Sequence, residues 1–401
     1  MTAPLGPSPA APPVARIGDI DVLRGFALLG ILLINAQLMA GPATTLGGGA
    51  SAGLADRGAA WVVTALVAGK FYLLFSFLFG YGFTLQQRSA EHAAVAFGPR
   101  HLRRTAALFL LGLAHAVLLY PGDILMTYAV LGLVLFALRA VPPRTLLRIA
   151  AGLLGTLVLL FLVHGLFALA LTEPERTGDA ATTTAGPTAD LVAAYRGGPG
   201  SVLLANLRLL PEFLGANMLY SADLLAAFLV GLAAGRWRAS ADPGHHRGRM
   251  RRIVRRGLPF GLAGGLFMAA CTHGPLDSGW FHIGRAAGVL TAPALTAAYA
   301  CGVLLLVRTP AGRKLARALA PAGRMSLTNY LTQSFVLALV FTGYGLGLYG
   351  RIGTATVLAG CLVLYAVQLA LSALLLKHLR SGPAEYVLRA ATRGGFPQRT
   401  R

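Results

Sequence analysis

The sequence predicts an all-α fold, a polytopic integral membrane helix bundle with about ten transmembrane helices. Of its 401 residues, 56% are hydrophobic and only 12% are charged, and the mean hydropathy is +0.66. A soluble globular protein carries about 25% charged residues, so this chain lacks the polar surface that such a protein needs. Several stretches approach the roughly 20 apolar residues that a helix needs to cross a bilayer. Basic residues gather between these stretches, as they do in cytoplasmic loops.

Ten apolar stretches define the predicted spans. They are residues 20–40, 60–86, 104–120, 122–139, 146–171, 214–236, 257–272, 286–307, 325–345 and 354–376. The second is long enough to tilt or bend near Gly69. The turn sequence "YPGD", residues 120–123, joins the third and fourth spans and is typical of a helical hairpin.

The segments outside the spans also have distinct compositions. Residues 1–15 are uncharged and rich in Pro and Ala, which predicts a disordered tail and not a signal peptide. The bundle is expected over 16–376, followed by a basic cytoplasmic tail at 377–401. An outer loop at 172–213 begins with a polar stretch and ends with apolar residues at the spacing of a short interfacial helix. The loop at 236–256 is strongly basic and is expected to meet anionic lipid headgroups.

The distribution of basic residues predicts the orientation. With the N-terminus inside, 28 of the 35 Lys and Arg residues fall in cytoplasmic segments and 6 in outer loops. This asymmetry predicts that both termini are cytoplasmic. The net charge of +21 therefore indicates topology in a bacterial cytoplasmic membrane, with lipid as the partner, and does not indicate nucleic acid.

The sequence indicates no metal site, disulfide or bound cofactor. Its three cysteines lie in or beside apolar segments and show no C-x-x-C pairing. His273 and His282 flank an outer loop at a spacing that no metal site uses. No P-loop, haem or flavin motif is present, which argues against an ATP-driven pump.

One group of polar residues falls at the outer side of the predicted bundle. Ionisable groups at membrane depth cost about 2.5–3.5 kcal/mol each on insertion scales, so they are candidates for function. His115 could act as a general base with Asp123 or Asp223, because a histidine pKa lies close to neutral pH. Other interpretations stay open: His115 as a buried structural residue, Asp123 as a helix cap, and Lys70 and Asp223 as an ion pair.

A second group is expected to bind substrate or donor; it begins at the cytoplasmic side and reaches inward to Asn35, which falls toward the outer side. In "DIDVLRGFALLGILLIN", Asp21 and Arg24 are three residues apart and share a helical face, and Asn35 continues nearly the same stripe. Lys70, deeper in the bilayer, belongs to the same binding set. In "GRMSLTNYLTQS" the polar face consists of Ser326, Asn329 and Gln333. The alternatives to binding are purely structural. Asp21 and Arg24 could form a salt bridge at the membrane interface, and the late polar stripe of Ser326, Asn329 and Gln333 could form hydrogen bonds between helices.

These segments resemble the bacterial domain-of-unknown-function 418 (DUF418) family, the YeiB-like membrane proteins. The matching pieces are "DVLRGFALLGILLIN", "GKFYLLFSFLFGYGF", "GLAHAVLLYPGDILMTYAVLG", "GRMSLTNYLTQS" and "GPAEYVLRAAT", which together run from residue 16 to about 393. The family implies a fold and little chemistry.

A more distant similarity links residues 21–25 and 323–330 to transmembrane acyltransferases, namely acyltransferase family 3 and heparan-glucosaminide N-acetyltransferase-like proteins. Two features depart from them: Gln333 replaces a frequent histidine, and the first outer loop lacks one. His115 is our inferred replacement. The similarity implies acyl transfer from a cytoplasmic acyl-CoA to an acceptor at the outer face. The alternatives are a transporter or exporter of a small metabolite, and a non-catalytic scaffold.

Overall fold

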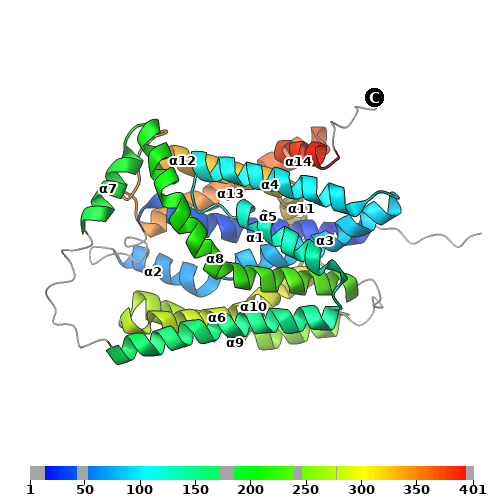
Figure 1. Cartoon of the computed structure of the whole chain (residues 1–401), viewed down its shortest axis with the longest axis horizontal. Coiled ribbons are helices and arrows are strands. Elements are labelled where there is room, and N and C mark those ends of the chain that lie inside the picture. The colour runs from blue at the N-terminus through cyan, green and yellow to red at the C-terminus, as the bar shows by residue number, and fades with distance from the viewer. Residues whose placement is uncertain (1–13, 43–52, 172–184, 238–245, 277, 394–401) are drawn as a thin grey trace, which may run out of the picture.

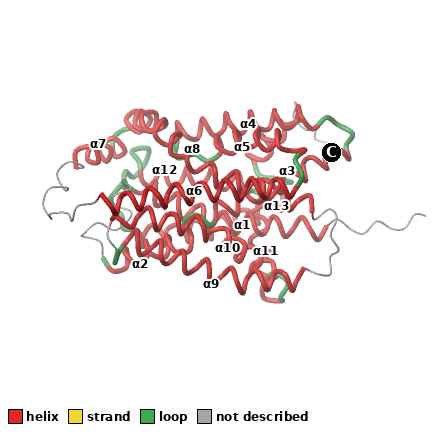
Figure 2. The backbone as a smooth tube through the Cα atoms, turned by 60° about the horizontal axis from the view of Figure 1, so that its bottom comes forward, coloured by secondary structure: helices red, strands yellow, loops and turns green. Residues whose placement is uncertain are grey.

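The computed structural model describes residues 14–42, 53–171, 185–237, 246–276 and 278–393. In this part of the chain the structure is helical throughout and contains no strand. Figures 1 and 2 show most of the helices side by side along one long axis, with α7 at one end. All ten predicted ranges contain helix, so the predicted all-α character is confirmed for the described residues.

The long helices account for most of the described residues. Their bounds are α1 (Val14–Ala40), α3 (Phe71–His92), α4 (Phe97–Leu118), α6 (Pro143–Leu171), α8 (Pro199–Trp237), α9 (His246–His273), α10 (Phe281–Leu306) and α13 (Thr354–His378). The shorter helices are α2 (Leu54–Val62), η2 (Val63–Val67), α5 (Leu125–Ala137), η3 (Leu138–Ala140), α7 (Ala185–Arg196), η5 (Ser278–Trp280), α11 (Pro310–Arg324), α12 (Ser326–Phe341) and α14 (Pro383–Arg393).

Five helical segments in the described residues are long and apolar enough to cross a membrane. They are Gly18–Ala40, Leu54–His92, Pro143–Leu171, Phe281–Leu306 and Thr354–His378. The bent pair Pro199–Met218 and Ser221–Trp237 makes a sixth if it is one span. Because α4 and α9 begin with several arginines, their apolar portions are shorter than the helices themselves. The count of ten spans and the orientation of the termini stay predictions.

Large apolar side chains cover the outer faces of α6 and α13. On α6, Leu159, Leu166 and Phe167 are more than half exposed, as are Leu362 and Val363 on α13. A soluble protein rarely exposes apolar surface so densely. These faces are suited to contact with lipid.

The helices are interrupted at the two positions that were predicted from the sequence. The second span breaks at Gly69, whose φ of +84° lies in the left-handed region that glycine adopts readily. The break separates the π-helical turn η2 from α3 and leaves Lys70 at the start of α3. The "YPGD" turn separates α4 from α5, which confirms the predicted helical hairpin.

Three segments differ from their predicted loop character. The apolar part of the expected outer loop is not a separate interfacial helix, because it forms the first arm of α8, which bends by 53° toward its second arm. Residues 246–256 of the expected basic loop are helical and begin α9. Residues 383–393 of the expected tail form α14, which packs on α4 and α12. The N-terminal tail at 1–15 lies almost entirely outside the described residues, as does the polar stretch 172–184.

Helix α1 lies at the centre of the packing and contacts α3, α11, α12 and α13. Glycines allow the closest helix approaches. A Cβ added at Gly323 of α11 would collide with the backbone oxygen of Asp21 on α1, and one at Gly80 of α3 would collide with that of Phe228 on α8. Close backbone approach at small residues is the usual means of helix association in lipid. The Gly323 crossing fixes the arginine-bearing end of α1 against α11, and the Gly80 crossing fixes α3 against α8.

Candidate functional site

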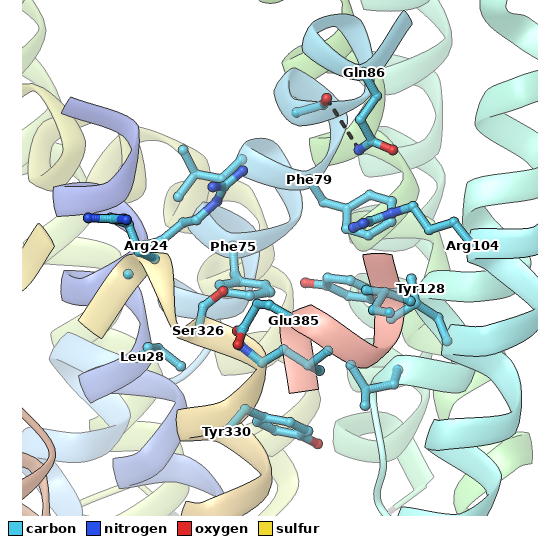
Figure 3. Close-up of a pocket in the computed structure, with 18 of the residues that line it drawn as sticks. Arg24, Leu28, Phe75, Phe79, Gln86, Arg104, Tyr128, Ser326, Tyr330 and Glu385 are labelled. Carbon is cyan, nitrogen blue, oxygen red and sulfur yellow. Dashed lines mark hydrogen bonds between the residues drawn. The ribbon is translucent and has the colours of Figure 1, made fainter. Parts of the chain in front are cut away.

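A cavity of about 390 Å³ opens at the arginine-rich end of the bundle. It lies between α1, α3, α4, α5, α11, α12 and α14, so segments from both halves of the sequence form its wall. Figure 3 shows Arg24 and Arg104 on opposite sides of it, with Tyr330 below. Its volume falls within the roughly 300–1,000 Å³ typical of small-molecule sites.

Four arginines line this cavity, which we call the arginine cavity. The guanidinium of Arg24 lies 3.3 Å from the Asp21 carboxylate, so the predicted pair on α1 is formed. Arg104 of α4 lies over the ring of Phe79, 5.9 Å from its centroid. Arg324 and Arg389 are exposed at the mouth.

Glu385 of α14 is the single carboxylate that lines the arginine cavity. It accepts hydrogen bonds from the N-terminus of α12. Its Oε1 accepts hydrogen bonds from the backbone N–H groups of Leu327 (2.7 Å) and Thr328 (3.1 Å). Its Oε2 accepts a hydrogen bond of 2.6 Å from the Thr328 hydroxyl. Glu385 therefore caps α12, whose first N–H groups would otherwise lack partners. The wall as a whole favours an anion.

The inner wall of the arginine cavity is apolar. Leu28 and Ile31 of α1, with Phe75 and Leu78 of α3, face it. Tyr128 adds an aromatic surface, and its hydroxyl is held by the Ser76 hydroxyl at 2.6 Å. A cationic mouth above an apolar wall suits an amphiphile that carries an anionic group.

His115 and Asp123 lie directly behind Tyr330 and are almost completely buried. His115 Nδ1 lies 2.9 Å from Asp123 Oδ1, although the ring is not turned for a straight hydrogen bond. Its Nε2 is buried and has no partner among the described residues. The Tyr330 hydroxyl donates to Asp123 Oδ1 at 3.2 Å, and the Tyr330 and His115 rings lie 5.1 Å apart.

Two structural features hold Asp123 in this position. Its Oδ2 accepts a hydrogen bond of 2.9 Å from the backbone N–H of Met126, so the expected capping of α5 is also present. Gly112 of α4 faces the same carboxylate, and a Cβ there would lie 2.6 Å from Oδ2. The hairpin and this glycine together bring Asp123 against the helix that carries His115.

Asp223 and Lys70 do not join the His115–Asp123 pair. Asp223 Oδ2 accepts a hydrogen bond from the Tyr72 hydroxyl at 2.9 Å, and Lys70 Nζ donates to the Thr64 carbonyl at 3.1 Å. Within the described residues no ion pair links the two, so the alternative of a neutralising Lys70–Asp223 salt bridge is not formed. Asp123 is the partner of His115.

The late polar stripe divides between two roles. Asn329 donates to the Ser372 hydroxyl at 2.9 Å, and Gln333 donates to Gln368 Oε1 at 2.8 Å. Both bonds join α12 to α13, as the interpretation of interhelical hydrogen bonds predicts. Ser326 instead lines the arginine cavity. Asn35 is half-buried on α1 and does not line that cavity.

A second, smaller cavity of about 180 Å³ lies near the α7 end of the bundle, between the first arm of α8 and the "YPGD" turn. Tyr120 lines it, and the backbone N–H of Tyr120 donates to the His115 carbonyl at 3.0 Å. We call it the tyrosine cavity. The His115–Asp123 pair is thus in contact with a residue of each cavity. Tyr330, which lines the arginine cavity, donates to Asp123, and Tyr120, which lines the tyrosine cavity, is bonded to the His115 carbonyl.

Sequence reasoning missed several of the lining residues. Glu385 and Arg389 lie in the segment "GPAEYVLRAAT", and Tyr330 lies within "GRMSLTNYLTQS". Both segments match the family resemblance, but no pattern in neighbouring residues predicts that α14 packs back onto α12. The polar residues inside those two segments were the only feature of the sequence that could have indicated a role in the cavity.

Comparison with known proteins places the whole chain in one family. Residues 234–395 match the family described as "Protein of unknown function (DUF418)". The chain is 32% identical to the uncharacterised protein YxaH of Bacillus subtilis over 94% of each chain. It is 28% identical to the uncharacterised protein YeiB of Escherichia coli over 93% of this chain and 95% of that one. No solved structure matches. The chain belongs to the DUF418 family of YeiB-like proteins.

Proposed function

We propose that this protein is an acyltransferase of the bacterial cell membrane, which moves an acyl group from a cytoplasmic acyl-CoA to an acceptor at the outer face. The supporting observation is the contact series from the arginine cavity through Tyr330 and Asp123 to His115. It couples an anion-binding site to a buried histidine that has one free ring nitrogen. The termini and the arginine cavity are cytoplasmic in this proposal.

The arginine cavity is the proposed donor site. The phosphates of an acyl-CoA would meet the exposed Arg324 and Arg389 at the mouth, because guanidinium groups bind phosphate through paired hydrogen bonds. Arg24 and Arg104 lie further in. The thioester arm would extend along the apolar wall of α1 and α3. A volume of about 390 Å³ accommodates that arm and leaves the nucleotide outside.

His115 is the proposed general base. Asp123 orients its ring and stabilises the imidazolium, and Nε2 takes a proton from the hydroxyl or amine of the acceptor. The acceptor then attacks the thioester carbonyl. The C–S bond breaks, and the imidazolium returns its proton so that CoA leaves as a thiol. Tyr330 lies between cavity and histidine, so its side chain has to move for the thioester to approach.

The test uses purified protein in nanodiscs with radiolabelled acetyl-CoA and a panel of sugars and amines. We expect His115→Ala to lower CoA release and acyl transfer by about 100-fold or more, the usual contribution of a general base. Equilibrium binding of acetyl-CoA should change less than about two-fold. His164→Ala, on α6, is the matched control and should retain the wild-type rate. If folded wild-type protein neither binds nor turns over any acyl-CoA, the proposal is wrong.

Transport of a small metabolite is a second candidate, because the second apolar segment is broken at Lys70. Broken helices with a polar residue at the break are typical of transporter substrate sites. Lys70 is fully buried there, and its Nζ bonds a carbonyl of η2. A transporter would lose flux in Lys70→Met and yield no covalent product. An acyltransferase would yield labelled acceptor.

A further inference from the structure

The tyrosine cavity has an aromatic wall that is held rigidly. Tyr195 of α7 stacks on Tyr349 with ring centroids 4.7 Å apart, and Tyr120 meets Phe213 edge-on at 5.9 Å. All four rings line the cavity. The Tyr195 hydroxyl donates to Asn206 Oδ1 at 2.8 Å, which fixes its ring in position.

The charge of this cavity is opposite to that of the arginine cavity. Glu212 of α8 is the one charged side chain among its lining residues. Nearby, Arg196 donates from Nε to the Tyr349 carbonyl at 2.8 Å, and it does not line the cavity. Burial raises the pKa of Tyr349 to about 12 and also raises that of Tyr195, so these phenols stay neutral near pH 7. The lining therefore combines four aromatic rings and several aliphatic side chains with a single negative charge.

Aromatic faces with a carboxylate at the rim are the usual site for an organic cation. The face of each ring is negative, and an ammonium group within about 6 Å is attracted by about 0.5–2 kcal/mol. A sulfate, phosphate or carboxylate group would meet Glu212 and no cation in the wall. A purely apolar ligand would gain no attraction from the exposed Glu212 carboxylate.

We propose that the tyrosine cavity binds an organic ammonium group, and that the acceptor of the acyl group carries it. The role as acceptor site rests on the acyltransferase proposed above, whereas the binding of the cation does not. Tyr120 follows His115 by a little more than one helical turn and is tied to its carbonyl. An acceptor anchored by its ammonium group in this cavity would direct a hydroxyl or a second amine toward His115.

The experiment measures binding of choline by calorimetry and by saturation-transfer NMR. The protein is held in nanodiscs of phosphatidylglycerol, a lipid without a choline headgroup. The comparison ligand is 3,3-dimethyl-1-butanol, which has the shape of choline without its charge. We expect saturable choline binding and at least ten-fold weaker binding of the neutral analogue.

Three variants locate the binding. Glu212→Gln should weaken choline binding about ten-fold, and Phe213→Leu, which keeps apolar volume but removes a ring, about five-fold. Asp190→Asn removes an exposed carboxylate from α7 outside the cavity and should have no effect. Thermal unfolding of each variant confirms that it is folded.

Three results would overturn the inference: no saturable choline binding by folded protein, equal binding of the neutral analogue, or equal weakening by Glu212→Gln and Asp190→Asn. The first two indicate an apolar cavity, and the third indicates only general surface charge. Choline binding without His115-dependent CoA release would refute the acyltransferase and leave the cation site standing. His115-dependent CoA release without choline binding would do the reverse.

Discussion

The two cavities of this protein differ in almost every property except their nearness to His115. The arginine cavity is large, has four guanidinium groups in its wall and has α14 as one of its sides. The tyrosine cavity is about half that size, has four aromatic rings and one carboxylate, and is formed by the end of α1, by α7 and α8, and by the turns around Tyr120 and Tyr349. A symmetrical channel for one solute would offer similar chemistry at both ends. Opposite chemistry suits two different ligands that meet between the cavities.

The largest expected effect comes from the carboxylate between the cavities. Gly112→Ala places a methyl group against Asp123 Oδ2 and the start of α5, so Asp123 has to move away from His115. We expect CoA release to fall about 100-fold, near the loss for His115→Ala, while acetyl-CoA and choline still bind. Steady-state kinetics and calorimetry measure the two quantities.

The control for this change is Gly155→Ala on α6, where no atom lies within 4 Å of an added Cβ. It should keep the wild-type rate. A Gly112→Ala protein with full activity would show that the His115–Asp123 contact plays no part in turnover.

A smaller effect should separate the two cavities by charge. Arg104→Gln removes a cation from the arginine cavity and should weaken acetyl-CoA binding about ten-fold, which corresponds to about 1.4 kcal/mol. Choline binding should not change, because Arg104 does not line the tyrosine cavity. Titrations at low and high salt measure this, and the difference between wild type and variant should persist at high salt, because a charge further inside the cavity is screened less than the charges at the mouth.

Arg103→Gln is the matched control, since Arg103 is exposed on the same helix and does not line the arginine cavity. Equal weakening by both substitutions would mean that only the general charge of this end matters, and that the arginine cavity is not a binding site.

The cap of α12 should contribute to stability more than to chemistry. Glu385→Gln keeps the shape of the side chain but removes the charge that interacts with the N-terminus of α12. We expect a loss of about 1 kcal/mol in the free energy of unfolding, the usual size of such a cap. Thermal unfolding in detergent measures it. Glu91→Gln, whose carboxylate contacts only an exposed glutamine on its own helix, should leave the midpoint unchanged.

The smallest effect should come from the polar contacts between α12 and α13. Gln333→Leu leaves the Oε1 of Gln368 without its donor and should cost about 0.6 kcal/mol, the average for such bonds between membrane helices. The double variant Gln333→Leu with Gln368→Leu removes both partners, and we expect it to regain part of this loss. Unfolding measurements on all three proteins form the cycle. A double variant that loses the sum of both single effects would argue against direct pairing.

The local features of the fold could be predicted, because apolar stretches, turns and glycine breaks depend on residues that are close together in the sequence. The ten helical ranges, the break at Gly69 and the hairpin at "YPGD" follow from such signals. That hairpin also explains why His115 contacts Asp123, one of its two candidate partners, since eight residues separate them around a tight turn.

What could not be predicted depends on contacts between distant segments. Asp223 pairs with Tyr72 because α8 crosses α3, and no local pattern states that crossing. The same holds for Glu385, whose partners lie 57 and 58 residues earlier in the chain. The composition of residues 172–213, 236–256 and 377–401 suggested loops or a tail, but in the structure parts of these three segments are helical and belong to α8, α9 and α14.

The position of α14 has a consequence for how the protein is made. This helix comes last in the described chain, yet it caps α12 and completes the wall of the arginine cavity. During synthesis every earlier apolar helix can enter the bilayer before α14 leaves the ribosome. The wall of the arginine cavity is therefore complete only after translation has passed residue 393, so an incomplete chain can have its apolar helices in place while this cavity still lacks one side.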